Sequence, residues 1–288
     1  MAFEDIFQVV DSATAEDGTV VEILEMTDLK GYWDTYAAER LYFANRAGMR
    51  AKMVRIRLQD TNVRLEPGAL YYMKGDLELK TGTRGGIMKG LLRKTIAGET
   101  FFVNEIHGTG EVYLEPTFGH CILHHIEQEE QAVIVDKGYF LAGTSGLDIG
   151  TAKQKKTSAA LFGGKGFFQT RVTGRGVAVI FSPVPLDEIQ KVSLGGDKLF
   201  VDGSFAFMRS LSVDFRVEKS NKSWLGTSVA GEGFLSTFSG RGHVWLAPTQ
   251  SVYSRLVTIP GGPKVTGGGM SGGGNDGDFG YDEGEDDD

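Results

Sequence analysis

Four residues with metal-binding side chains stand close together in the segment GHCILHHIE: His120, Cys121, His124 and His125. Imidazole and thiolate are ligands that zinc prefers, and zinc takes three or four protein ligands. If this segment is a strand, His120 and His124 share one face and Cys121 and His125 share the other, because side chains alternate. Each face then offers two ligands. Two interpretations stay open: a metal site at His120 and His124, or histidines of an ordinary sheet.

Three segments each present lysines or arginines followed by large apolar residues, and we call them the basic-apolar loops. Basic residues beside exposed apolar ones suit contact with anionic lipid headgroups or with a partner protein. The alternative is that the apolar residues cover the adjoining core while the basic side chains are solvated. The apolar residues of the three loops are Leu91, Leu92, Leu161, Phe162, Trp224 and Leu225.

A pair of glycines separated by one residue occurs three times, with a spacing of 66 residues. The pairs are Gly108 and Gly110, Gly174 and Gly176, and Gly240 and Gly242. Phosphate-binding loops also use G-x-G, but they require a following helix, and these glycines lie within strand-like segments. The GGKG stretch at 163–166 lacks the Ser or Thr that a phosphate loop carries after its lysine.

The glycine pairs lie on the face that carries the large apolar residues in each copy. Along that face the order is large, small polar, large, Gly, Gly, apolar, apolar. Glycine inside a strand costs about 0.5–1 kcal/mol relative to alanine, so six such glycines need a structural cause. We expect a sharp bend or a close approach of another backbone at each pair.

The repeat predicts an all-β fold. Residues 53–260 are expected to form three tandem sandwich-like repeats around a pseudo-threefold axis, with a turn at Asp60–Asn62 and a closing strand at Val252–Ile259. Residues 1–52 form a small N-terminal α/β segment with a helix over 28–47, started by Thr27 or Asp28 and ended by Gly48. Residues 261–288 are rich in glycine and acid, a composition typical of disorder.

The net charge of −8 is located in the tail. Eight of the 38 acidic residues lie between Asn275 and Asp288, which leaves 30 in residues 1–274, equal to the 30 basic residues. A balanced body argues against nucleic-acid partners. The single cysteine, Cys121, excludes an internal disulfide and fits a reducing compartment. The sequence shows no signal-peptide pattern and no apolar run of 18 residues. We expect a cytoplasmic protein.

Several phrases in the repeats resemble one family. LEPGALYYMKGDLEL, AGETFFVNEIHGTGEVYLEP, VDKGYFLAG, FGGKGFFQTRVTGRG and AGEGFLSTFSGRGHVWLAPT are similar to the altered inheritance of mitochondria protein 24 family, from about Arg40 to Tyr253. The resemblance implies a fold akin to the tryptophan RNA-binding attenuation protein and a poorly defined function, linked in a yeast mitochondrial member to inner-membrane organisation. The absence of a mitochondrial presequence indicates a bacterial member.

No catalytic motif stands out in the sequence. We therefore expect a non-enzymatic scaffold or protein-interaction module that has a protein partner or self-associates, needs no cofactor, and sits in the cytoplasm or peripheral to a membrane. The alternative is a small-ligand or metal-binding protein, or an enzyme, with a pocket between repeats.

Overall fold

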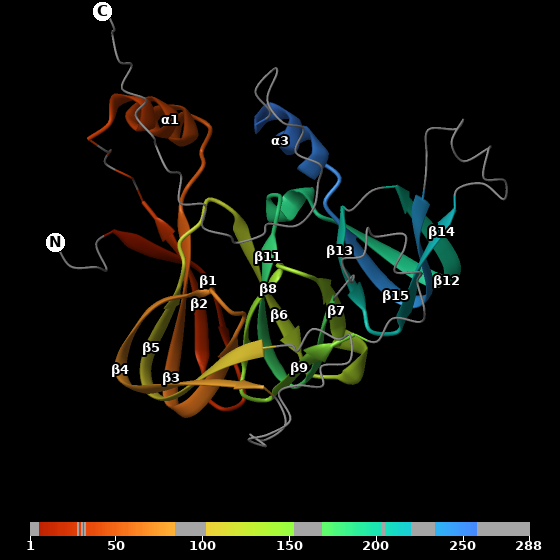
Figure 1. Ribbon diagram of the computed structural model, residues 1–288, viewed down its shortest axis with the longest axis horizontal. Helices are drawn as coiled ribbons and strands as arrows, with labels where there is room; N and C mark the ends of the chain where they lie inside the picture. The colour runs from red at the N-terminus through yellow and green to blue at the C-terminus, as the bar shows by residue number, and fades with distance from the viewer. Residues whose placement is uncertain are drawn as a thin grey trace, which may run out of the picture.

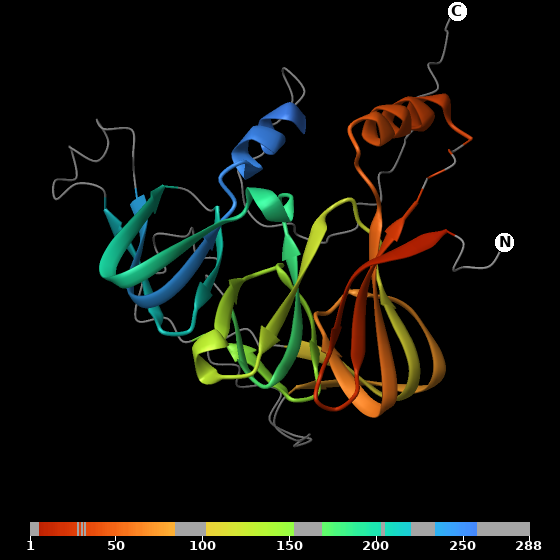
Figure 2. The same cartoon turned by 180° about the vertical axis from the view of Figure 1, so that it is seen from behind.

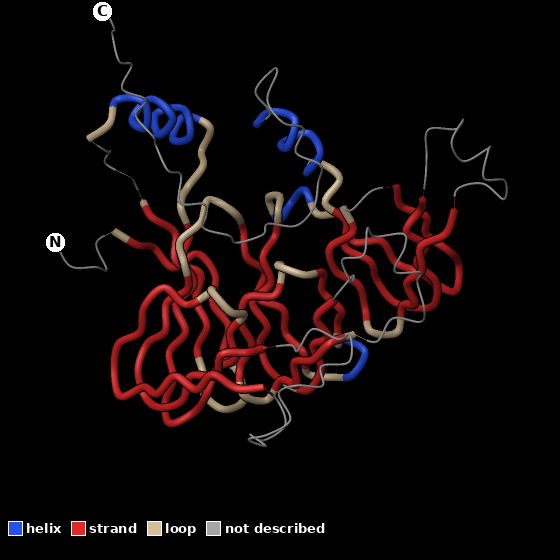
Figure 3. Tube along the Cα trace, in the orientation of Figure 1, coloured by secondary structure: helices blue, strands red, loops and turns tan. Residues whose placement is uncertain are grey.

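The computed structural model describes residues 6–27, 29, 31, 33–83, 102–152, 169–202, 205–219 and 234–257. Most of these residues lie in strands, so the predicted all-β class is confirmed (Figures 1 and 3). The tail at 261–288 lies outside the described residues. The strands are β1 (Phe7–Thr14), β2 (Val20–Met26), β3 (Lys52–Leu65), β4 (Leu70–Thr83), β5 (Phe102–Leu114), β6 (His120–Ile126), β7 (Val133–Asp136), β8 (Phe140–Thr144), β9 (Leu147–Thr151), β10 (Gln169–Gly174), β11 (Gly176–Ser182), β12 (Gln190–Asp202), β13 (Ala206–Ser210), β14 (Val213–Lys219) and β15 (Phe234–Leu246).

The strands form two curved sheets. The first has the order β1-β2-β3-β8-β11-β6, with β5 attached to β3 and β4 attached to β5. The second has the order β12-β15-β13-β7-β10-β9, with β14 attached to β15. The N-terminal strands β1 and β2 are continuous with the first sheet, because β2 pairs antiparallel with β3.

The alternating apolar pattern of β3 explains its place in the core. Ile56 and Leu58 are buried before a break in register, and Val63 and Leu65 are buried after it. The predicted turn at Asp60–Asn62 is wrong: β3 runs through it as one strand with a bulge at which Asp60 has φ 53°. An inserted bulge residue keeps the apolar side chains of both halves on the core side.

The three largest core clusters of the described residues follow one another along the molecule. Strands β2, β3 and β5 contribute most of the first, strands β7 to β11 most of the second, and strands β12 to β15 most of the third. In Figures 1 and 2 these groups of strands lie side by side in chain order. The pseudo-threefold axis stays a prediction.

The first glycine of each pair lies where another backbone presses against the strand, whereas Gly176 and Gly242 lie against side chains of the neighbouring strand. The first glycine of each pair stands opposite Leu77, Leu147 or Val213 of a neighbouring strand. All six glycines have positive φ, between 94° and 156°. A Cβ at Gly240 would lie 2.8 Å from the Ser212 carbonyl oxygen, and a Cβ at Gly174 would overlap the Gly146 carbonyl oxygen.

Two helices lie on the same side of the sheets in both views (Figures 1 and 2). Helix α1 (Thr35–Arg46) is shorter than expected, because its N-cap is Asp34 rather than Thr27 or Asp28. Helix α3 (Gln250–Val257) replaces the strand expected at Val252–Ile259. The Thr249 carbonyl accepts from the amides of Val252 and Tyr253, which starts a helix directly after Pro248.

Candidate interaction surfaces

The helices carry a group of exposed apolar side chains that we call the helical surface. None of the 12 described residues of α1 is buried. Trp33 is 86% exposed, and Tyr36, Tyr42 and Phe43 are each about 60% exposed. On α3, Leu256 is 77% exposed. The helical surface consists of Trp33, Tyr36, Tyr42, Phe43, Met49, Val252, Tyr253 and Leu256.

Local capping explains how α1 forms without a buried face. The Asp34 carboxylate accepts hydrogen bonds from the amides of Tyr36 and Ala37, at 3.3 and 3.1 Å. At the other end Gly48 takes φ 74°, as a glycine after a helix commonly does. The Arg40 guanidinium lies 4.4 Å from the centre of the Tyr36 ring and donates to its hydroxyl. These contacts hold aromatic and cationic groups together on an exposed helix.

Helix α3 is tied to the β-sheet body through Glu188. The Glu188 carboxylate accepts a hydrogen bond from Tyr253 Oη at 2.6 Å and another from Thr249 Oγ1. These two hydrogen bonds lower the pKa of Glu188, and the bond to Glu188 raises the pKa of Tyr253. Gln250 Nε2 also donates to the Tyr139 hydroxyl at 3.4 Å. The exposed apolar residues of α3 are therefore presented from a fixed helix.

Two of the histidines, His124 and His243, lie beside the Trp245 ring. His124 Nε2 lies 2.8 Å from the Gln131 carbonyl oxygen, and the His124 and His243 rings lie 6.2 and 5.8 Å from Trp245. Burial lowers the pKa of His120 and of His124, which favours neutral rings. Among the described residues, no group of three or more His, Cys, Asp or Glu side chains is arranged to hold a metal ion.

A buried polar group that sequence reasoning missed joins β7, β10 and β13. Gln169 Nε2 donates to Asp136 Oδ1 at 2.5 Å, and Arg209 Nη2 donates to Gln169 Oε1 at 2.9 Å. Burial raises the pKa of Asp136 to about 6 and lowers the pKa of Arg209 to about 10. The sequence contains a signal for this group: an acidic residue stands two positions before a turn glycine in Glu66-Pro67-Gly68 and again in Asp136-Lys137-Gly138. Burial likewise raises the pKa of Glu66 to about 6.

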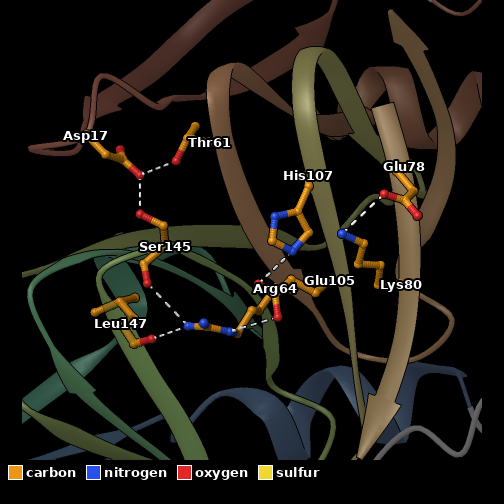
Figure 4. A network of polar contacts seen from close by, with 9 residues as sticks. All are labelled: Asp17, Thr61, Arg64, Glu78, Lys80, Glu105, His107, Ser145 and Leu147. Atoms are coloured by element: carbon orange, nitrogen blue, oxygen red, sulfur yellow. Dashed lines mark hydrogen bonds and ion pairs between the residues drawn. The ribbon is translucent and has the colours of Figure 1, made fainter. Parts of the chain in front are cut away.

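A second polar network connects the first and second groups of strands (Figure 4). Arg64 Nη1 donates to the carbonyl oxygens of Ser145 and Leu147, at 3.3 and 2.5 Å, and Arg64 Nε lies 3.6 Å from Glu105. The Asp17 carboxylate accepts from Thr61 Oγ1 at 2.8 Å and from Ser145 Oγ. Burial opposes the ionised form of Asp17, but these hydrogen bonds and those from Thr19 hold its pKa below the usual value. The network ties turns and strands together, so its role is structural.

The apolar residues of the basic-apolar loops lie outside the described residues. They are Leu91, Leu92, Leu161, Phe162, Trp224 and Leu225. The structural glycines and the histidines are described, but they do not converge on one site. The helical surface was not predicted as a site, although a helix over 28–47 was expected from the sequence.

Comparisons with known proteins agree with the resemblance seen in the sequence. A crystal structure of protein SPYM3_0169 from Streptococcus pyogenes matches 70% of this chain and 94% of its own, with 23% sequence identity and a TM-score of 0.51. At that identity the likeness shows the fold. A search of curated proteins found no match. None of the described helices is long and apolar enough to cross a membrane. The model of the family described as Mitochondrial biogenesis AIM24 matches residues 45–249, most of the chain, and the protein therefore belongs to that family.

Proposed function

We propose that this protein is a non-enzymatic protein-interaction module that binds a partner protein through the helical surface. The observation that carries the proposal is α1, a capped helix with no buried residue that presents Trp33, Tyr36, Tyr42 and Phe43 to solvent. A solvated helix does not need these side chains, because its termini are satisfied by Asp34 and by the turn at Gly48.

The composition of this face favours a protein over a lipid surface. Trp, Tyr and Arg dominate the energetically important positions of protein interfaces. Here Arg40 is already stacked on Tyr36, which reduces the side-chain entropy lost on binding. Three arginines, Arg40, Arg46 and Arg50, stand against one acid, Glu39, in residues 35–50, so the partner surface is apolar with acidic groups at its rim.

Repetition within the β-sheet body supports a scaffold role. Three glycine-pair strands stand in the same register to their neighbours, through the pairs Leu77–Gly108, Leu147–Gly174 and Val213–Gly240. We include in the proposal that three 66-residue repeats build a rigid body from which the helices project. A location in the cytoplasm, or at the surface of a membrane, belongs to the same proposal.

The test replaces Tyr42 with a photo-crosslinking amino acid and compares crosslinks in native extract for two variants. One is Trp33→Ser/Tyr36→Ser/Phe43→Ser, and the control is Val9→Ser/Val10→Ser, which removes exposed apolar side chains from β1 instead. We expect one crosslinked protein that the α1 variant loses and the β1 variant keeps. Equal crosslinking by both, or flotation with anionic vesicles that depends on the α1 residues, contradicts the proposal.

A further inference from the structure

Two junctions within the chain are made in the same way. At the first, β8 pairs with the end of β3 through Val63–Thr144, Arg64–Gly143 and Leu65–Ala142. At the second, β13 pairs with β7 through Val133–Ser210, Ile134–Arg209 and Val135–Met208. The registers are equivalent, because Val63 and Val133 each stand opposite the residue two before the first glycine of a pair, Ile106 and Val172.

Each side of these junctions has one more equivalent in the chain. A segment of β4 is equivalent to β8 and β13, and a segment of β12 is equivalent to the end of β3 and to β7. Tyr72, Met73 and Lys74 of β4 correspond to Ala142–Thr144 and to Met208–Ser210, because Tyr72, Ala142 and Met208 stand opposite Tyr113, Val179 and Trp245, which are 66 residues apart. Leu199, Phe200 and Val201 of β12 correspond to Val63–Leu65, because Leu199 stands opposite Phe238, two residues before Gly240. In the described chain β4 pairs with β5 and β12 pairs with β15, and neither has a second partner strand there.

The segments that form the junctions are buried, whereas the equivalent segments of β4 and β12 carry exposed apolar side chains. Ala142 is fully buried and Met208 is 2% exposed, whereas Tyr72 and Met73 are each 37% exposed and Tyr71 is 58% exposed. On the other side of the junction, Ile134 is 8% exposed and Phe200 is 54% exposed. A long edge strand with exposed apolar side chains is a template for pairing with another chain.

We propose that a second copy of this chain pairs with the first through these edges, with β4 of one copy against the end of β12 of the other. The internal junctions fix the register: Tyr72 opposite Val201, Met73 opposite Phe200 and Lys74 opposite Leu199. The chain does not close on itself, since β4 and β12 lie at opposite ends of the row of strands in both views (Figures 1 and 2). The contact is head-to-tail, so copies assemble into a ring if the rotation closes and into a filament if it does not.

The contact is independent of the helical surface, because it uses main-chain hydrogen bonds of the sheet edges with Tyr71, Met73 and Phe200 as apolar contacts. It extends both sheets, as β-strand addition does. Self-association through the sheet edges can therefore be correct even if no partner binds the helical surface. Partner binding can likewise be correct even if the chain does not self-associate.

Cysteine substitution at the predicted pair tests the register, in a Cys121→Ala background that removes the native thiol. Met73→Cys and Phe200→Cys proteins are made separately, mixed and oxidised. Residues directly opposite in a sheet have Cβ atoms about 4.5–5.5 Å apart, near the range for a disulfide. We expect a disulfide between the two proteins in the mixture and not in either alone. Glu78→Cys, an exposed residue of β4 outside the predicted register, serves as the control in place of Met73→Cys.

Sedimentation of the otherwise unchanged full chain gives the second measurement. We expect concentration-dependent assembly that Phe200→Glu abolishes. In dilute solution, where neither protein is assembled, the two should have the same thermal unfolding temperature because Phe200 is exposed. Mixing Phe200→Glu with Met73→Lys protein is expected to restore a contact between opposite charges. A chain that stays monomeric at every concentration overturns the proposal. So does equal crosslinking of Glu78→Cys, or a disulfide within one chain carrying both Met73→Cys and Phe200→Cys.

Discussion

Asp136 and Arg209 are joined through the side-chain amide of Gln169. The amide donates to the carboxylate and accepts from the guanidinium. Gln169 and Arg209 are buried, and Asp136 is partly buried. Arg209 Nε and Nη1 have no hydrogen-bond partner among the described contacts, and the Arg209 guanidinium lies 5.7 Å from the Phe215 ring. Two charges thus sit inside the sheet junction with one amide between them.

Removing the arginine is expected to leave an uncompensated buried carboxylate. Arg209→Met should lower the free energy of unfolding at pH 7 by about 3–5 kcal/mol, as breaking a buried pair does. The loss should shrink near pH 5, because Asp136 can then be protonated in the folded protein. Asp136→Asn/Arg209→Met should cost less than the sum of its single variants. Urea unfolding at both pH values measures this, and additive losses independent of pH would contradict it.

Glu66 is expected to make the protein less stable as pH rises. Burial raises its pKa from 4.5 to about 6, against the attraction of Lys137. The folded protein therefore binds this proton more tightly than the unfolded chain, so stability contributed by Glu66 is lost between about pH 4.5 and pH 6. Glu66→Gln should raise the free energy of unfolding by about 1 kcal/mol at pH 7 and leave it unchanged at pH 4.

The control for Glu66 is Glu130→Gln, which makes the same substitution at an exposed position. Thermal unfolding temperatures at the two pH values decide the matter. An equal effect of Glu66→Gln at pH 4 and pH 7 would show that the carboxylate does not titrate in this range.

Cys121 is expected to be inert in the folded protein. Its side chain is 3% exposed, and burial raises the pKa of its thiol to about 12, so almost no thiolate is present at pH 8. A disulfide reagent should leave it unmodified until denaturant is added, and then react with one thiol per chain. Rapid modification of the native protein would show that β6 opens.

The strands could be predicted because their signals are local. Alternation of apolar residues, turn glycines and the spacing of Gly108, Gly174 and Gly240 identify the all-β class and most strands. The predicted element boundaries were wrong where the local sequence fits two different conformations. At Asp60 a bulge replaces the predicted turn, and after Pro248 the residues Val252, Tyr253 and Leu256 fit a helix face as well as a strand. Hydrogen bonds from Thr249 and Tyr253 to Glu188 select the helix, and no local pattern reveals them.

The candidate surfaces were also hard to predict, because they depend on contacts between segments that are far apart in the sequence. Tyr72 and Phe200 resemble buried strand residues in the sequence, because aromatic side chains in strands usually face a core. Their exposure depends on which strand lies beside β4 and β12, and that is a property of the assembled sheets. Asp136 resembles an ordinary turn residue in the sequence. Its role depends on Gln169 and Arg209, which come from strands distant in the sequence.

Replacing a glycine of a pair with alanine is expected to destabilise the fold, because the added Cβ has no room and the backbone conformation disfavours it. Gly174 has φ 94°, and a Cβ there would overlap the Gly146 carbonyl oxygen, so Gly174→Ala introduces both strain and overpacking. We expect a loss of about 2–4 kcal/mol in the free energy of unfolding. Gly195→Ala is the matched control: it also lies within a strand, but its φ is ordinary and no atom lies within 4 Å of the added Cβ. Removing backbone freedom from the unfolded chain should leave that variant as stable as the unchanged protein or slightly more stable. Thermal unfolding distinguishes the two, and equal stability of both variants would mean that the backbone at Gly174 relaxes away from Gly146.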